Sequence, residues 1–350
     1  MVINKGIENM KYLMFSDIHW GKTNNSQLKN QDCLDFIEFV CNYVENNPID
    51  QIIFLGDWFD NRDSINVQTL YYSSKGLEKL NSISKKTPIK FIVGNHDLFL
   101  KNSRDITSLL VAKEFTNIQV ISEPTMIGED LYCPWLVGDE KLPLLIKKYN
   151  PRYVFGHFEL PSFKFNQFVT YEGIFNAEDY KSDKLKKIFS GHFHTANGHD
   201  GIYYIGSTHS LDMSDVDDES NKGITILDTD TSETIQVPWD NAPIYRKINI
   251  SQLLDHEDEY LSGLHKIYLN IVLDINFNDK KEEYREQLKE KYDIRNISYQ
   301  AQWFEDATQE VEDVEVKDFS NVETLVVQYI KQIETESVRV DRLIELFNSI

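Results

Sequence analysis

The sequence predicts an α/β protein. Its main domain is expected to be a two-sheet β-sandwich flanked by helices, followed by a small α/β capping domain and C-terminal helices. Three observations support this fold class. Short apolar runs alternate with helical spacing through the first 150 residues, and a second group of apolar runs follows with hairpin turns. Aromatic residues are plentiful, with 18 Tyr and 20 Phe, which is typical of a well-packed core.

The first half of the main domain alternates strands and helices. Apolar runs at residues 12–15, 51–55 and 89–93 each precede a polar or glycine-containing loop. Apolar residues between the runs recur at helical spacing. They are Cys33, Ile37, Val40, Cys41 and Val44 in the first interval, and Leu70, Leu77 and Leu80 in the second. This pattern predicts an α/β layer with buried strands.

The second half of the main domain contains further strands. The runs that predict them are residues 153–155, 188–189, 202–205, 224–227 and 234–237. The later runs are separated by hairpin signals such as the Asp-Gly pair at 200–201. Two sheets flanked by helices accommodate both halves.

Composition changes near Pro243 and predicts four parts of the chain. The main domain spans 1–243, and a capping domain spans 244–304 with strand, helix, strand, helix and strand in order. An acidic, apolar-poor linker follows at 305–318. The last part, 319–350, contains two short amphipathic helices. Their apolar stripe either packs on its own domain or reaches a partner protein.

Charge and composition limit the function. A formal charge of −21 argues against tight, autonomous binding to a DNA duplex, because phosphate contacts need Lys and Arg. It leaves room for a nuclease whose metals and partner supply the positive field. No apolar run approaches the roughly 18 residues of a membrane helix. Three cysteines are a sparse, odd set, so we expect a cytoplasmic protein, in the host cell if the chain is phage-encoded.

Five short motifs carry the chemistry, and each follows a predicted strand. They are Ser16-Asp17-Ile18-His19, Gly56-Asp57-Trp58-Phe59-Asp60, Gly94-Asn95-His96-Asp97, Gly156-His157-Phe158 and Gly191-His192-Phe193-His194. Strand ends in an α/β sheet point toward a shared crevice, so residues distant in sequence meet there. Any one motif alone is explained by a turn or a buried histidine. All five in this order predict one metal centre.

Oxygen and imidazole ligands indicate the type of metal. Carboxylate, amide and histidine groups suit Mn, Fe, Zn and similar ions, and no cysteine ligand is offered. A carboxylate can bridge two cations through its two oxygens. Two cations about 3.5–4 Å apart can hold the attacking and leaving oxygens of a phosphoryl displacement.

The motif order resembles that of the calcineurin-like metallophosphoesterase superfamily. The segments 156–163 (GHFELPSF) and 190–195 (SGHFHT), together with the small domain after Pro243, are similar to the SbcD-type nucleases. Within that group the chain resembles the nuclease subunits of bacteriophage recombination endonucleases. The resemblance covers nearly the whole chain from Lys11 onward.

The resemblance implies a role for each motif residue. One divalent metal would be held by Asp17, His19, Asp57 and His194, and the second by Asp57, Asn95, His157 and His192. Mn²⁺ is the expected ion, with Mg²⁺, Fe²⁺ and Zn²⁺ as alternatives. His96 would protonate the leaving oxygen or stabilise the phosphate in the transition state.

Asp60 departs from the pattern of many cellular relatives, which have His at this place. We hypothesise that its carboxylate accepts a hydrogen bond from His96 and raises the pKa of that histidine, making it an acid. The alternative is a simple loop carboxylate.

The resemblance implies an Mn-dependent DNA exonuclease and endonuclease subunit acting in recombination and repair. Its C-terminal helices would dock on an SbcC-like ABC ATPase, and no Walker A pattern occurs in this chain. The resemblance also implies a homodimer, with residues 67–80 and 107–115 as the candidate interface, although their apolar content would equally suit an intramolecular core. One alternative is a phosphatase or phosphodiesterase acting on protein or small-molecule phosphate esters. Another is a non-enzymatic scaffold, against which the intact ligand set argues.

Overall fold

The computed structural model describes residues 9–135, 141–160, 163, 177–215, 222–273 and 281–301. The chain divides into two compact units, residues 1–300 and 301–350. The predicted acidic linker and the C-terminal helical segment lie outside the described residues. The predicted domain boundaries within the chain stay predictions.

The first sheet has six strands in the order β14-β13-β1-β2-β3-β6. Strands β1, β2, β3 and β6 run parallel, and β13 and β14 complete one side in antiparallel pairing. The strand bounds are β1 (Lys11–Phe15), β2 (Gln51–Phe54), β3 (Ile89–Ile92), β6 (Ile118–Ile121), β13 (Gly223–Asp228) and β14 (Thr234–Pro238).

The second sheet also has six strands, in the order β11-β12-β10-β9-β8-β7. Its four central strands are parallel and its two edges are antiparallel. The strand bounds are β7 (Thr125–Ile127), β8 (Asp130–Cys133), β9 (Tyr153–His157), β10 (Lys187–Gly191), β11 (Asn197–His199) and β12 (Ile202–Tyr204). Two sheets of this kind confirm the predicted sandwich.

Side-chain alternation along the strands packs the two sheets face to face. In β1, Tyr12 and Met14 point inward and join a buried cluster with Phe155 and Phe189 of the second sheet. Their neighbours along β1 point to the other face and join the cluster that contains the helices. Successive residues of a strand face opposite sides, so one short apolar run contributes to both layers.

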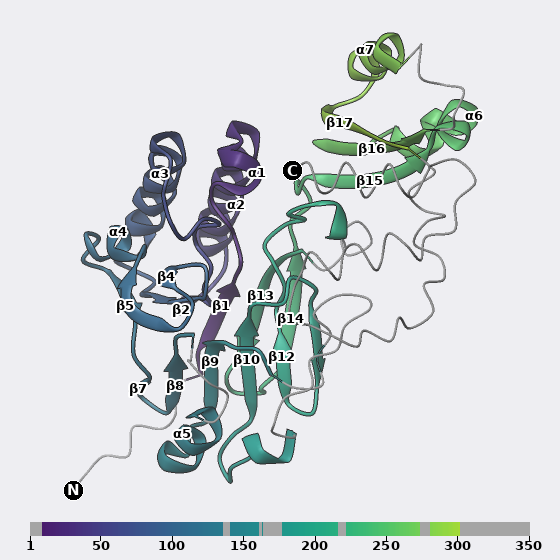
Figure 1. The fold of residues 1–350 in the computed structure, drawn as a ribbon. Coiled ribbons are helices and arrows are strands. Elements are labelled where there is room, and N and C mark those ends of the chain that lie inside the picture. Colours follow the sequence, from purple (N-terminus) through teal and green to yellow (C-terminus); the bar gives the residue numbers. More distant parts are fainter. Residues whose placement is uncertain are drawn as a thin grey trace, which may run out of the picture. The chain divides into compact units, whose positions relative to one another are not determined.

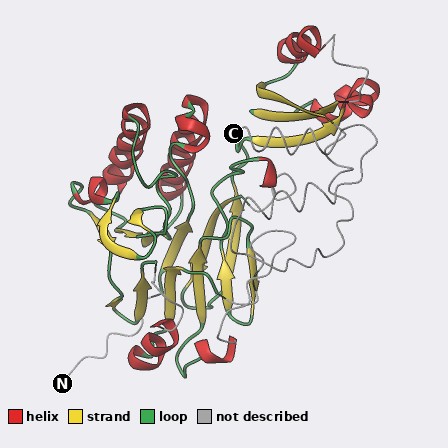
Figure 2. Cartoon of the chain, in the orientation of Figure 1, coloured by secondary structure: helices red, strands yellow, loops and turns green. Residues whose placement is uncertain are grey.

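Helices cover the outer faces of the sheets (Figures 1 and 2). Helices α2 (Gln27–Asn46) and α3 (Val67–Ile83) contact each other and share the buried cluster of the first sheet. Helix α5 (Lys141–Tyr149) buries Leu142 and Ile146 in the cluster of the second sheet. Shorter elements are α1 (Lys22–Asn25), α4 (Leu110–Lys113), η1 (Ala177–Tyr180), η2 (Met213–Asp215) and the hairpin of β4 (Leu98–Leu100) and β5 (Ser103–Thr107).

Residues 244–301 form the predicted strand, helix, strand, helix, strand series. The elements are β15 (Ile244–Asn249), α6 (Ile250–Leu261), β16 (Ile267–Leu273), α7 (Lys281–Lys291) and β17 (Ile294–Ala301). The three strands make their own sheet in the order β15-β16-β17, with a separate buried cluster around Leu269 and Ile271. In the part of the chain that the structure describes, every helix is too short or too polar to cross a bilayer.

Candidate metal centre

The carboxyl ends of five parallel strands bring the motifs together. β1, β2 and β3 are neighbours, so the loops that carry Asp17, Asp57 and Asn95 leave the first sheet side by side. β9 and β10 pair in parallel in the second sheet, where His157 ends β9 and His192 directly follows β10. The site therefore lies at one end of the sandwich, with residues supplied by both sheets.

The first two loops continue the parallel pairing beyond the strands, but with an unusual backbone. The N–H of Asp17 donates to the Gly56 carbonyl at 3.0 Å, and the N–H of His19 donates to the Asp57 carbonyl at 3.2 Å. Positive φ angles occur at Asp17 (53°), His19 (51°), Asp57 (64°) and His192 (90°). Non-glycine residues rarely adopt this conformation, and such strain concentrates at functional sites.

Two motif glycines allow the loops to approach closely. A Cβ added at Gly94 would lie 2.2 Å from Asp57 Oδ1, and one added at Gly191 would lie 2.9 Å from Asp17 Oδ2. Real carbon atoms do not come this near, so any larger residue would push the carboxylates away. The glycines before Asn95 and His192 are therefore required by the packing of the site.

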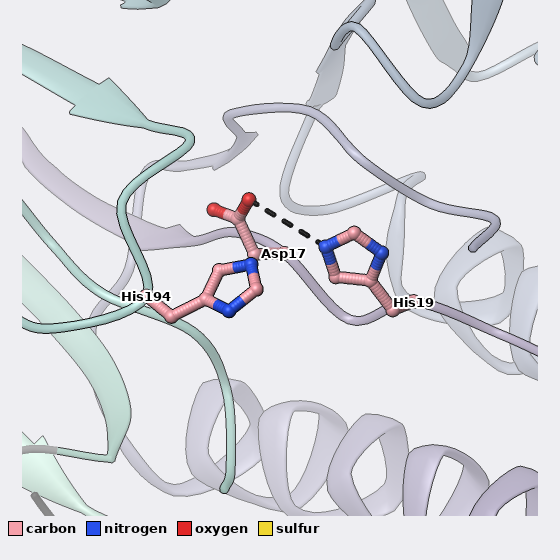
Figure 3. Close-up of side chains that lie close together, drawn as sticks. All are labelled: Asp17, His19 and His194. Atoms are coloured by element: carbon pink, nitrogen blue, oxygen red, sulfur yellow. Dashed lines mark ion pairs between the residues drawn. The ribbon is translucent and has the colours of Figure 1, made fainter. Parts of the chain in front are cut away.

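Asp17, His19 and His194 form one cluster of possible ligands (Figure 3). Each residue offers one ligand atom, and these atoms lie within 4.8 Å of one another. His19 Nε2 is 3.9 Å from Asp17 Oδ1. It is a buried nitrogen without a hydrogen-bond partner among the described residues. The Asp17 carboxylate is oriented by the N–H of His192, which lies 3.1 Å from Oδ2.

Asp57, His157 and His192 form a second cluster, with Asn95 beside it. His157 Nδ1 lies 2.7 Å from the Leu55 carbonyl, which only accepts, so this nitrogen carries the proton. In the neutral ring, Nε2 then points a lone pair at Asn95 Oδ1 (2.8 Å) and Asp57 Oδ2 (3.4 Å). A cation among these three acceptors, either a proton on His157 or a metal ion, would relieve their repulsion.

Asp57 lies between the two clusters. Its Oδ2 is 3.7 Å from His19 Nε2 and 3.4 Å from His157 Nε2. Its Oδ1 accepts the N–H of His96 at 2.8 Å, which fixes the carboxylate plane. Burial raises the pKa of Asp57, but His157 and His19 outweigh it and hold the pKa well below its usual value. An ionised carboxylate is thereby shared by both groups.

The structure brings together all seven predicted ligand residues. They are Asp17, His19, Asp57, Asn95, His157, His192 and His194. The donors are carboxylate, amide and imidazole groups, which fit divalent ions such as Mn²⁺, Fe²⁺ and Zn²⁺. The unpaired His19 nitrogen and the converging acceptors around His157 both favour bound cations.

The hypothesis for Asp60 was wrong about its contact. His96 Nδ1 lies 2.7 Å from the backbone carbonyl of Asp60, not from its carboxylate. The carboxylate instead lies 3.2 Å from His19 Nδ1 and 3.4 Å from Lys22 Nζ. Burial lowers the pKa of His96 to about 4, which is opposite to the predicted direction, although Asp57 acts to raise it.

Comparison with known proteins identifies the family. The model of the calcineurin-like phosphoesterase family matches residues 10–211, more than half of the chain. The chain belongs to this family. The predicted class of metal-dependent phosphoesterase is thus confirmed, and the observed site agrees with the family's use of divalent metals.

Two of the proteins that this chain matches have nuclease names. Exonuclease subunit 1 of Enterobacteria phage T4 is 30% identical over 251 residues, which are 69% of this chain and 70% of the relative. The solved structure of nuclease MPE from Pseudomonas putida matches with 17% identity and a TM-score of 0.29. That match covers 53% of this chain and 62% of the Pseudomonas putida chain, so it spans less than two thirds of the length of nuclease MPE.

Sequence reasoning missed one residue that shapes this phosphoesterase site. Asp97 is buried, and its carboxylate accepts the N–H groups of Asp57, Gly94 and Trp58, each at 2.9 Å. It therefore fixes the loops of the second and third motifs to each other. The signal was present in the sequence, since Asp97 ends the Gly-Asn-His-Asp motif, but only its first three residues were interpreted.

Sequence reasoning also missed Glu159, two residues after His157. Glu159 Oε1 lies 3.7 Å from His192 Nε2. The nearby His192 ring lowers the pKa of Glu159, despite the opposing effect of burial. A carboxylate behind a ligand histidine orients the ring and raises its basicity.

Proposed function

We propose that the protein is a DNA nuclease subunit that hydrolyses phosphodiester bonds with two divalent metal ions, most favourably Mn²⁺. One observation carries the two-metal part of the proposal. Asp57 Oδ2 lies within 4 Å of His19 Nε2 and of His157 Nε2, which belong to the two separate clusters. A carboxylate in this position would bridge two cations held by the residues on either side.

The residues of the chain would divide the work as follows. One ion would be held by Asp17, His19 and His194. The other would be held by Asn95, His157 and His192. Asp57 would bind both ions. When bound, such ions activate water and neutralise charge on the phosphate. His96 would act beside them. Its Nδ1–H donates to the Asp60 carbonyl, so Nε2 is the nitrogen that can face the substrate. An anionic phosphate against Nε2 would favour protonation of the ring, which could then protonate the leaving oxygen.

Two arguments favour DNA as the substrate over protein or small phosphate esters. The T4 relative is an exonuclease subunit by name, and its similarity extends over 69% of this chain. The residues after 243 add a separate sheet that a small phosphatase does not need. The proposal extends to a role in recombination and repair, on the resemblance of the motifs to the SbcD-type nucleases. The charge of −21 implies that metals and a partner contribute to DNA binding.

The proposed assembly has two partners and a cytoplasmic location. Residues 319–350 would dock on an SbcC-like ABC ATPase, and a second copy of the chain would pack against α3 and α4. Exposed apolar side chains on these helices support the dimer: Val67 is 82% exposed, Tyr71 60% and Leu110 55%. Val67 and Tyr71 lie four residues apart on α3, and exposed apolar residues that neighbour each other are typical of an interaction surface.

A nuclease assay on the full-length chain tests the proposal. The protein would be stripped of metal and given Mn²⁺ with end-labelled duplex DNA, with and without the ATPase partner. The same samples would be given a generic aryl phosphate. We expect DNA cleavage that requires Mn²⁺ and is lost in Asp57→Asn. Turnover of the aryl phosphate without DNA cleavage in any sample would instead support the phosphatase alternative.

A further inference from the structure

Lys222 is a buried lysine next to the metal centre. Only 1% of it is exposed, although lysine is among the residues least often buried. Its Nζ donates to the His194 carbonyl at 2.7 Å and to Ser207 Oγ at 2.9 Å. Burying an ammonium group is costly unless it is well hydrogen-bonded, so this placement needs a reason.

The His194 carbonyl is held from two directions. Besides the Lys222 ammonium group, the N–H of Ser207 donates to it at 3.0 Å. The Ser207 hydroxyl in turn donates to the His209 carbonyl at 2.9 Å. Lys222 thus joins the His-x-His loop to the loop that contains Ser207 and His209.

Lys222 reaches His194 from the other sheet. It immediately precedes β13, which pairs with β1 in the first sheet, whereas His194 follows β10 of the second sheet. The Lys222 backbone is itself fixed, because its carbonyl accepts the N–H of Trp239 at 3.0 Å. The start of β13 therefore fixes the position of the Lys222 ammonium group, and the ammonium group fixes the position of the His194 loop.

We propose that Lys222 is a positioning residue of the metal centre, which fixes the His194 backbone so that the His194 ring faces Asp17 and His19. The proposal rests on the proposed metal-binding function. The three side chains already offer ligand atoms within 4.8 Å of one another. Without the Lys222 contact, the His194 loop would keep the hydrogen bond from the His192 N–H to Asp17. It would lose the hydrogen bond that the first sheet gives to the His194 carbonyl. Metal affinity would fall, as it does when groups that orient ligands are removed.

Titration calorimetry of the metal-free, full-length protein with Mn²⁺ tests this role. Lys222→Met keeps the apolar stem of the side chain but removes the ammonium group and its donors. We expect Mn²⁺ to bind about 10–100-fold more weakly in the ion site that includes His194. Lys222→Arg keeps N–H donors and should recover part of the affinity. The control is Lys90→Met, another buried lysine, whose Nζ contacts Gln51 and Tyr132 and not a loop of the metal centre. It should bind Mn²⁺ as the wild type does.

The outcomes separate this inference from the proposed function. If the wild type binds no Mn²⁺, the proposed function fails. If the wild type binds and a folded Lys222→Met binds equally well, only the role of Lys222 is overturned. Should Lys222→Met not fold, Lys222→Gln replaces it, because its polar amide tolerates burial but its donor is one bond shorter. The same criterion then applies. Failure of both variants to fold, even with saturating Mn²⁺, would make Lys222 structural and would also overturn the proposal.

Discussion

The Asp60 carboxylate lies 3.2 Å from Nδ1 of His19 and so orients the ring of a proposed metal ligand. The carboxylate favours the tautomer with its proton on Nδ1, which leaves His19 Nε2 to face the carboxylates of Asp17 and Asp57. Lys22, 3.4 Å from the same Asp60 oxygen, balances its charge. Histidine ligands in metalloproteins commonly donate their second nitrogen to a carboxylate in this way.

Asp60→Ala should therefore weaken metal binding without unfolding the protein. Removing the acceptor frees the His19 ring to rotate and to change tautomer, so we expect about 10–100-fold lower affinity for Mn²⁺. Asp60→Asn keeps an acceptor oxygen and should lose less. Asp63→Ala changes an exposed residue of the same loop and serves as the control. Equal Mn²⁺ affinity in all four proteins, measured by calorimetry, would refute the orienting role.

Asp97→Asn should destabilise the fold and disrupt the site together. Three backbone N–H groups at 2.9 Å donate to the carboxylate, and an amide would turn its own NH₂ toward one or more of them. Leaving buried donors unsatisfied is expected to lower the free energy of unfolding by about 3 kcal/mol. Urea denaturation measures this loss. Asp105→Asn, an exposed site on β5, should change the same quantity by less than about 0.5 kcal/mol. If the urea midpoint of Asp97→Asn equals that of the wild type, Asp97 does not hold the two loops together.

Asp130→Asn should change how stability depends on pH. Burial raises the pKa of Asp130 from 3.8 to about 6, although Tyr12 and Lys90 oppose the shift. The folded state thus binds a proton that the unfolded state has released between pH 3.8 and 6, so this group's contribution to stability falls as the pH rises through that window. An amide does not titrate.

The variant should gain stability relative to the wild type as the pH rises from 4 to 7, by up to about 3 kcal/mol. Thermal melts of both proteins over this range provide the measurement. The Tyr12 hydroxyl, 3.0 Å from Asp130 Oδ2, can still donate to the amide oxygen. Stability profiles that stay parallel from pH 4 to 7 would show that Asp130 titrates normally.

Charged substitutions on α3 should dissociate the proposed dimer. Val67 and Tyr71 are four residues apart on one face of this helix, with 82% and 60% of each exposed. The double variant Val67→Glu/Tyr71→Glu places two carboxylates in the interface, and we expect a monomer with unchanged circular dichroism. Sedimentation velocity measures the state of assembly. Leu254→Glu on α6, where the leucine is 50% exposed, is the matched control. A wild type that is already monomeric would remove the proposal.

Most of the central architecture was predictable because apolar runs and helical spacing report burial directly. Residues 12–15, 51–55 and 89–93 match β1, β2 and β3 to within a residue, because these strands are buried on both faces. The hairpin β4–β5 was not predicted. β4 is an apolar run, Leu98-Phe99-Leu100, but three residues are too few to mark a strand. β5 is mostly polar, and its Ile106 is 60% exposed.

The site was predictable as a set of residues but not as a network. The places of the motifs after strands predicted one metal centre, and the family resemblance supplied its seven ligand residues. The hydrogen-bond partners of Asp60 could not be predicted. A loop residue can offer either its carboxylate or its backbone carbonyl, and the sequence does not show which of the two is used. The role of Lys222 could not be predicted from the sequence for a related reason. It contacts His194 through a backbone carbonyl, and no side-chain pattern encodes such a contact.

The division of the ligand set between two sheets has a mechanical consequence. Asp17, Asp57 and Asn95 follow strands of the first sheet, and His157, His192 and His194 belong to the second. Ions bound among them would therefore link the two sheets at one end. Metal binding should then slow amide hydrogen exchange in both sheets at once, most strongly at the end where the ions bind.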